Sequence, residues 1–224
     1  DAHGTAIAGI IAAEPDNGVG IVGIAPAVRL RILKACWYDA STTAAVCDSF
    51  TLAKALAHAI DENTNIINLS LGGPSDALLS RLVSAALARD ILVVVADPVQ
   101  SLAGFPSDVP GVIVAGSVAQ PDADRLGTIL GAPGDEILVL VPGGGFDYAS
   151  GSSLSAAQVS GVAALLMAKR PGLHRDEIHE LLAGSRNATD ANVNACRALS
   201  SLLEQSGCGP GESGVSTKAF RMQP

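Results

Sequence analysis

Residues 151–162 read Gly-Ser-Ser-Leu-Ser-Ala-Ala-Gln-Val-Ser-Gly-Val, a turn-forming glycine and two hydroxyls directly before a long apolar helix of small residues. A serine in the first turn of a helix has a backbone N–H without a partner inside the helix, and the positive end of the helix dipole lies behind it. Ser153 is therefore a candidate nucleophile with half of an oxyanion site beside it. Taken alone, the pattern is more simply explained by Ser152 or Ser153 acting as the helix N-cap.

Outward from this helix, strand-like and helix-like apolar patterns alternate along the chain. The sequence predicts strands over residues 28–35, 65–71, 91–96, 112–115 and 137–141. It predicts helices over residues 1–13, 50–61, 76–89, 153–169, 175–183 and 194–204. This alternation indicates an α/β fold, a doubly wound, mainly parallel sheet with helices on both faces. Ligands of such sheets bind outside the carboxyl ends of the strands, where residues 70–73 are expected.

The composition limits the class of protein. The 224 residues are 48% apolar but only 3% aromatic, which suits a buried parallel sheet built from Ala, Val, Ile and Leu. A net charge of −8 argues against a nucleic-acid partner, because phosphates require a basic surface. Every apolar run is shorter than a bilayer requires, so we expect no membrane segment.

The cysteines fall into two local pairs. Cys36 and Cys47 flank a polar loop, and Cys196 and Cys208 flank the end of the last helix. If both disulfides form, the protein works in an oxidising compartment outside the cytosol. Four reduced, partly buried thiols are the alternative.

Five segments, in this order along the chain, resemble motifs of one family, the subtilisin-like serine proteases (subtilases, peptidase S8). They are His3-Gly4-Thr5, Asn68-Leu69-Ser70-Leu71-Gly72-Gly73, the stretch from Phe105-Pro106-Ser107 to Val114, Ala132-Pro133-Gly134, and Gly151-Ser152-Ser153-Leu154-Ser155-Ala156. The resemblance covers residues 1 to about 183. It implies the subtilisin-like fold and a secreted, extracellular or periplasmic peptidase acting on peptides or proteins.

The resemblance also implies roles for particular residues. His3 would be the general base and later the general acid, and the Ser153 hydroxyl would attack the scissile carbonyl. Substrate backbone would pair as an added strand along Ser70, Leu71, Gly72 and Gly73, with the glycines leaving room for a substrate side chain. No cofactor is expected. Enzymes of this family often bind calcium, and four acidic residues could serve as ligands: Asp122, Asp124, Asp135 and Glu136. Because no loop has the ligand spacing of a calcium site, no metal site is assigned.

Two catalytic groups depart from the family pattern. The triad aspartate of the family ends a strand well upstream of the histidine motif, and Asp1 is a poor substitute because residues two apart on a helix point to different sides. We therefore expect an N-terminally incomplete peptidase domain over residues 1–206, associated with an N-terminal segment of the same protein, and an irregular tail over residues 207–224. The family's oxyanion asparagine is also missing, because the turn after residues 91–96 reads Asp97-Pro98-Val99-Gln100.

Three hypotheses about function follow. The first is a serine endopeptidase whose upstream strand supplies the aspartate. The second is a catalytically impaired subtilisin-like domain that binds extended peptides as a scaffold or chaperone-like module. The third is an unrelated α/β enzyme acting on small molecules, in which His3 and Ser153 would lie far apart.

Overall fold

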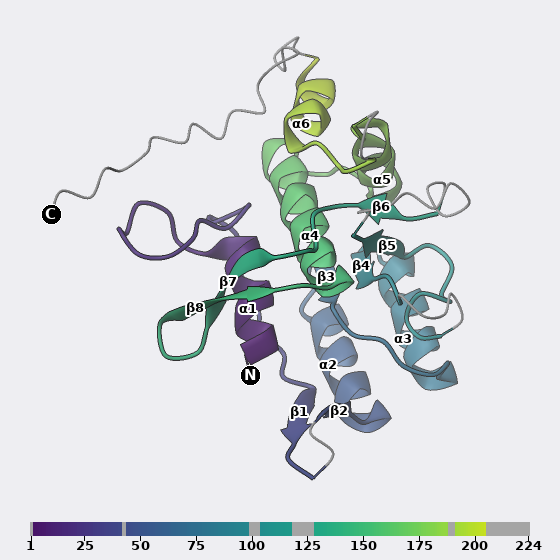
Figure 1. Ribbon diagram of the computed structural model, residues 1–224. Helices are drawn as coiled ribbons and strands as arrows, with labels where there is room; N and C mark the ends of the chain where they lie inside the picture. The colour runs from purple at the N-terminus through teal and green to yellow at the C-terminus, as the bar shows by residue number, and fades with distance from the viewer. Residues whose placement is uncertain (1, 42–43, 99–103, 118–127, 188–190, 205–224) are drawn as a thin grey trace, which may run out of the picture.

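The computed structural model describes residues 2–41, 44–98, 104–117, 128–187 and 191–204. A parallel four-stranded sheet forms its centre, in the order β3 (Ile66–Leu69), β4 (Leu92–Ala96), β5 (Ile113–Gly116) and β6 (Leu130–Gly131). The first three strands were expected, and β6 was missed because it is only two residues long. Figure 1 shows helices on either side of this sheet.

Side chains of β4 alternate between two hydrophobic clusters, one on each face of the sheet. Leu92 and Val94 pack with the helices α4 (Ser152–Lys169), α5 (Arg175–Gly184) and α6 (Ala195–Leu203). Val93 and Val95 pack with α2 (Ser49–Asp61) and α3 (Ala77–Ala88). Because the side chains of a strand point alternately to opposite faces, a fully apolar strand must be covered on both sides. The expected α/β architecture is confirmed.

A smaller unit packs beside this core. Helix α1 (Ala2–Ala12) contacts α4 and the antiparallel hairpin of β7 (Ile137–Val141) and β8 (Gly145–Ala149). Gly9 allows a close approach here, since a Cβ on it would lie 3.1 Å from the Leu140 side chain. Strand β7 was predicted with its observed bounds, but it pairs only with β8 and not with the parallel sheet.

The predicted strand over residues 28–35 is wrong. Among the described residues this segment pairs with no strand, and Leu30 and Ile32 are 41% and 65% exposed. A strand needs the backbone of a neighbour, and the only described partner of β3 is β4, so that β3 forms an edge of the sheet. Propensity alone cannot supply the missing neighbour.

An antiparallel hairpin follows this segment, formed by β1 (Cys36–Asp39) and β2 (Ala44–Cys47). The sequence had indicated only a polar loop. The expected disulfide between Cys36 and Cys47 closes the base of the hairpin. Cys196 is also disulfide-bonded, whereas its expected partner Cys208 and the predicted tail lie outside the described residues. Within the described part of the chain, no helix is long and apolar enough to span a membrane.

Candidate active site

Ser153 is the second residue of α4, and a glycine caps the helix in front of it. Gly151 is the N-cap, with a φ of 148°, and no side chain hydrogen-bonds there to cap the helix. The Ser152 hydroxyl donates instead to the carbonyl oxygen of Asp97, at 2.7 Å. The capping interpretation of Ser152 and Ser153 is therefore wrong, because both hydroxyls point to other segments of the chain.

His3 and Ser153 meet at one backbone oxygen. His3 lies in the first turn of α1, and its Nε2 is 3.1 Å from the carbonyl oxygen of Ser70, just beyond the end of β3. The Ser153 hydroxyl lies 3.4 Å from the same oxygen. Three segments distant in the sequence thus converge at the carboxyl end of the sheet, where the sequence had indicated the site.

A chain of hydrogen bonds holds Ser70 in place. Its hydroxyl donates to the Ser153 carbonyl at 2.9 Å and accepts from the Asn68 amide at 3.0 Å. The Asn68 amide oxygen in turn accepts from the Ser160 hydroxyl, two turns along α4, at 3.0 Å. The sequence reasoning did not assign these roles to Asn68 and Ser160. The available signal was a polar side chain within an apolar strand, and a serine within an apolar helix.

The contact between His3 and the Ser70 carbonyl bears on which ring nitrogen of His3 carries the hydrogen. A carbonyl oxygen can only accept, so Nε2 of His3 carries the hydrogen in this arrangement. A general base for Ser153 needs Nε2 free, with the proton on Nδ1 and a carboxylate to hold it there. No carboxylate among the described residues forms a hydrogen bond with the His3 ring. With the hydrogen on Nε2, the His3 ring donates to Ser70 and cannot accept a proton from Ser153 at that nitrogen.

The expected substrate strand is open to solvent. A Cβ on Gly73 would meet nothing within 4 Å, and one on Gly72 would meet only the Phe105 carbonyl, at 3.9 Å. The Gly73 N–H donates to the Phe105 carbonyl oxygen at 2.9 Å, so that these two residues form an isolated antiparallel bridge. Gly104 is required there, because a Cβ on it would lie 2.6 Å from the Gly73 oxygen. The bridge thus holds Gly73 in place beside space that no described side chain fills.

The turn after β4 supplies no side-chain donor within the described residues. Asp97 is buried, its N–H donates to Ala115 at 2.8 Å, and its carbonyl is taken by Ser152. Pro98 has no N–H to offer. Gln100, the nearest amide in the sequence, lies outside the described residues.

No group of three or more His, Cys, Asp or Glu side chains in the described ranges is arranged to hold a metal ion. Of the residues considered for calcium, Asp122 and Asp124 lie outside those ranges, and the Asp135 carboxylate accepts from Ser150 at 2.7 Å.

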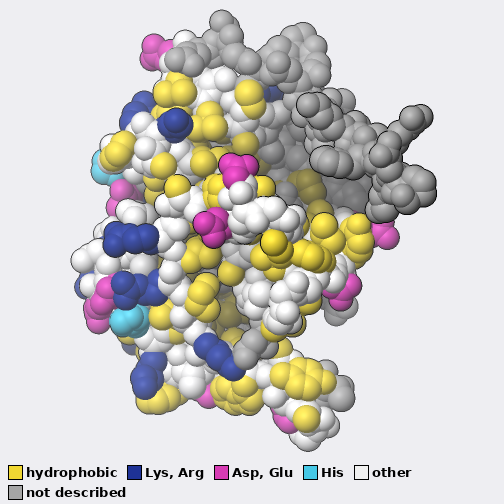
Figure 2. Space-filling model, turned by 90° about the vertical axis from the view of Figure 1, so that its left-hand side faces the viewer, with side chains coloured by type: hydrophobic (Ala, Val, Ile, Leu, Met, Phe, Trp, Pro, Cys, Tyr) yellow, Lys and Arg dark blue, Asp and Glu magenta, His cyan; other side chains and the backbone are white. Residues whose placement is uncertain are grey.

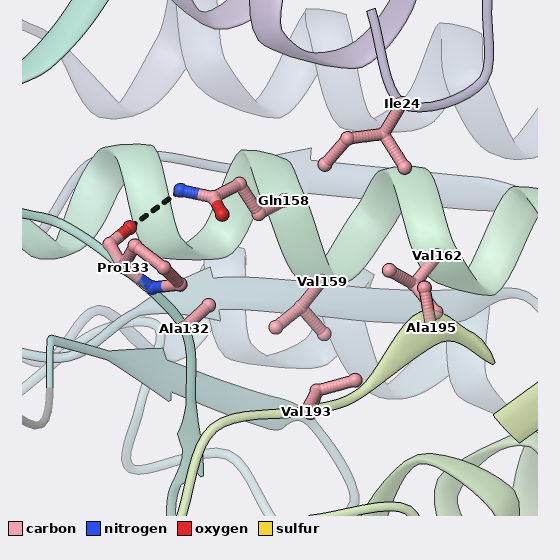
Figure 3. Close-up of a pocket in the computed structure, with 8 residues that line it drawn as sticks. All are labelled: Ile24, Ala132, Pro133, Gln158, Val159, Val162, Val193 and Ala195. Atoms are coloured by element: carbon pink, nitrogen blue, oxygen red, sulfur yellow. Dashed lines mark hydrogen bonds between the residues drawn. The ribbon is translucent and has the colours of Figure 1, made fainter. Parts of the chain in front are cut away.

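A pocket of about 240 Å³ lies further along α4 and is not the candidate site (Figure 3). Its one long polar side chain, Gln158, donates to the Pro133 carbonyl, and no candidate site residue lines it. The lining is otherwise apolar or small: Ile24, Ala132, Pro133, Val159, Val162, Val193 and Ala195.

Comparison with known proteins gives this geometry its context. The sequence model of the subtilase family, Peptidase S8, matches residues 1–199. The chain belongs to the subtilase family. This membership, together with the convergence of His3 and Ser153, excludes an unrelated small-molecule enzyme.

Several subtilases resemble this one. It is 30% identical to the cell wall-associated protease of Bacillus subtilis (strain 168) over 188 residues, 80% of this chain and 20% of the relative. It is 33% identical to the thermophilic serine proteinase of Bacillus sp. (strain AK1) over 189 residues, 80% of this chain and 45% of the relative. The chain thus spans less than half the length of either relative.

Solved structures show the same fold. The self-cleaved protease domain of PatA superposes with a TM-score of 0.72 at 27% identity, covering 91% of this chain and 84% of that one. Fervidolysin from Fervidobacterium pennivorans, a keratinolytic enzyme related to subtilisin, gives a TM-score of 0.74 at 26% identity, covering 88% of this subtilase and 36% of that chain.

Proposed function

We propose that this subtilase is a serine endopeptidase in which His3 and Ser153 are catalytic and an aspartate from an upstream segment completes the triad. The observation that carries the proposal is the Ser70 carbonyl, which lies within hydrogen-bonding distance of both His3 Nε2 and the Ser153 hydroxyl. The two side chains thus reach one backbone oxygen from two different helices, α1 and α4.

The chemistry is acyl transfer to serine. Ser153 Oγ attacks the scissile carbonyl while its proton passes to His3 Nε2, and that proton then goes to the departing amine. Water, deprotonated by His3, then releases the acyl group and restores the Ser153 hydroxyl. The backbone N–H groups in the first turn of α4 lie beside the nucleophile and support the developing oxyanion.

The open edge of the sheet supports an upstream partner strand. Strand β3 has one described neighbour, and the segment over residues 29–35, which forms no helix or strand, carries the exposed apolar side chains of Leu30 and Ile32. A further parallel strand along β3 would cover that edge. Its carboxyl end would lie level with Ser70, where a carboxylate could accept the Nδ1 proton of His3 and free Nε2 to act as base.

A peptide-binding scaffold is the second candidate function. The buried Asp97 turn favours it, because no side-chain oxyanion donor is found there among the described residues. Loss of one such donor in a related enzyme costs roughly 100- to 1,000-fold in turnover. The scaffold would use the same open strand, residues 70–73, without cleaving its ligand.

We also propose that the protein works outside the cytosol. The Cys36–Cys47 disulfide supports an extracellular or periplasmic location, because disulfides persist in oxidising compartments.

Peptide hydrolysis by the full natural gene product tests the proposal. We expect cleavage of an unstructured protein substrate, loss of more than about 1,000-fold in kcat in Ser153→Ala and in His3→Ala, and retained peptide binding in Ser153→Ala. The matched control is Ser84→Ala, on the exposed face of α3, which should leave kcat unchanged. Binding of extended peptides without cleavage by the folded wild type would replace the endopeptidase with the scaffold.

A further inference from the structure

The pocket of about 240 Å³ beside α4 is lined almost entirely by apolar side chains (Figure 3). Other apolar side chains stand out from the surface instead: the projection at the bottom of Figure 2 carries hydrophobic side chains that are clear of the body. A hollow encloses a ligand on several sides, whereas a projecting side chain does not. The shape of this pocket therefore points to an occupant.

The size of the pocket limits what that occupant is. Sites for drug-sized ligands measure roughly 300–1,000 Å³, and this pocket is smaller. An apolar cavity of about 150 Å³ is enough to hold benzene. A single phenyl side chain therefore fits the pocket.

Gln158 offers a polar contact to the backbone of an occupant. Its Nε2 donates to the Pro133 carbonyl, and its Oε1 accepts no hydrogen bond from the described residues. Figure 3 shows Gln158 at one end of the pocket and Val162 at the other. A peptide with a side chain among the valines can therefore donate a backbone N–H to Oε1.

The chain that follows α6 is anchored beside this pocket. Ala195 lines the pocket, and the next residue, Cys196, is disulfide-bonded. Cys36 bonds to Cys47, so Cys208 is the cysteine of these 224 residues that remains for Cys196. Such a bond would hold the Cα atom of Cys208 within about 7 Å of that of Cys196, next to the lining of the pocket.

Residues 205–224 lie outside the described residues and contain one aromatic side chain, Phe220. Phe220 follows Cys208 by twelve residues, a length of chain that spans up to about 40 Å. A helix with its side chains is about 10–12 Å across, so the pocket is within reach. Because the association is intramolecular, a side chain tethered in this way binds at an effective concentration in the millimolar range.

We propose that the segment after Cys208 returns past the start of α6 and that the Phe220 ring occupies the pocket beside α4. The ring packs against the valines of the pocket, and a neighbouring backbone N–H donates to Gln158 Oε1. The docked segment closes an apolar hollow on the helix whose first turn holds Ser153. Docking does not require peptide hydrolysis, so this inference stands or falls separately from the proposed function.

Methyl NMR of the full natural gene product tests this, in the Ser153→Ala form so that self-cleavage does not disturb the comparison. The probes are the methyl groups of the valines that line the pocket: Val159, Val162 and Val193. We expect the aromatic ring current to shift their signals, and Phe220→Ala to abolish that shift and to lower the melting temperature by about 3–6 °C. Met222→Ala is the matched control, because it removes a large apolar side chain from the same segment and should change neither.

A peptide of residues 213–224 added to the Phe220→Ala protein should restore the methyl shifts, and the same peptide with Ala in place of Phe220 should not. Valine methyl signals that are identical with and without the Phe220 ring would overturn the inference. Shifts that vary with protein concentration would also overturn it, because the ring would then come from a second copy of the chain.

Discussion

The Ser70 carbonyl is the point at which the candidate catalytic side chains meet. Its position depends on the Ser70 hydroxyl, which links the Asn68 amide to the Ser153 backbone. Asn68 is half-buried, and its two hydrogen bonds join β3 to α4. A buried network of this kind fixes geometry well only when each member has its partner.

Asn68→Ala removes both links. We expect a loss of about 1–3 kcal/mol in the free energy of unfolding, because Ser70 and Ser160 each lose a hydrogen-bond partner. We also expect a fall in kcat larger than any change in KM, measured with a peptide substrate. The matched control is Asn65→Ala, at an exposed position just before β3, which should change neither. A stable variant with unchanged kcat would show that the network does not position the site.

At the scale of the elements, the first turns of α1 and α4 hold the two candidate catalytic side chains. Apolar periodicity predicted every helix of the described residues to within two residues, because that signal is local. The β1–β2 hairpin was expected as a polar loop, and β7 was expected in the parallel sheet although it pairs with β8. Periodicity indicates that a segment is a strand but not which strand it pairs with. The Asn68–Ser160 bond joins residues 92 apart, and nothing in either local sequence indicates the other.

The Asp76 cap at the N-terminus of α3 predicts how the stability of the protein depends on pH. Asp76 caps α3, and its pKa is lowered from the usual 3.8 by the Ser49 hydroxyl and then the Leu79 N–H, against a smaller opposing effect of burial. A lowered folded-state pKa means that the stabilisation is complete above about pH 4 and is lost as the pH falls through the folded-state value. Melting temperatures from pH 5 to pH 2 should therefore fall more steeply in the wild type than in Asp76→Asn.

Asp16→Asn, in the exposed loop after α1, is the control for that series and should follow the wild type. Parallel melting curves for the wild type and Asp76→Asn would contradict the assignment.

On the scale of the whole molecule, the parallel sheet and its two layers of helices follow from the apolar runs, and the location of the site follows from the strand ends. That β3 forms an edge of the described sheet could not be predicted from the sequence. The apolar residues over 28–35 predict one more strand, but the strand with which they would pair is not among the described residues. A carboxylate bonded to the His3 ring is likewise not found among the described residues.

Hydrogen exchange on the full natural gene product tests whether a further strand fills that edge. We expect the amides of residues 29–35 to be protected, because they would pair with the inserted strand. The loop over residues 14–18 is the internal reference and should exchange freely, because its amides are exposed. Exchange of residues 29–35 at the rate of that loop would show that no strand lies there.

The most direct test of the catalytic assignment is the second-order rate of labelling of the full natural gene product by a fluorophosphonate, with the adduct located by peptide mapping. The account predicts an adduct on Ser153, no adduct in Ser153→Ala, and labelling at least about 100-fold slower in His3→Ala. An adduct on any other serine, or none at all on the folded wild type, would contradict it.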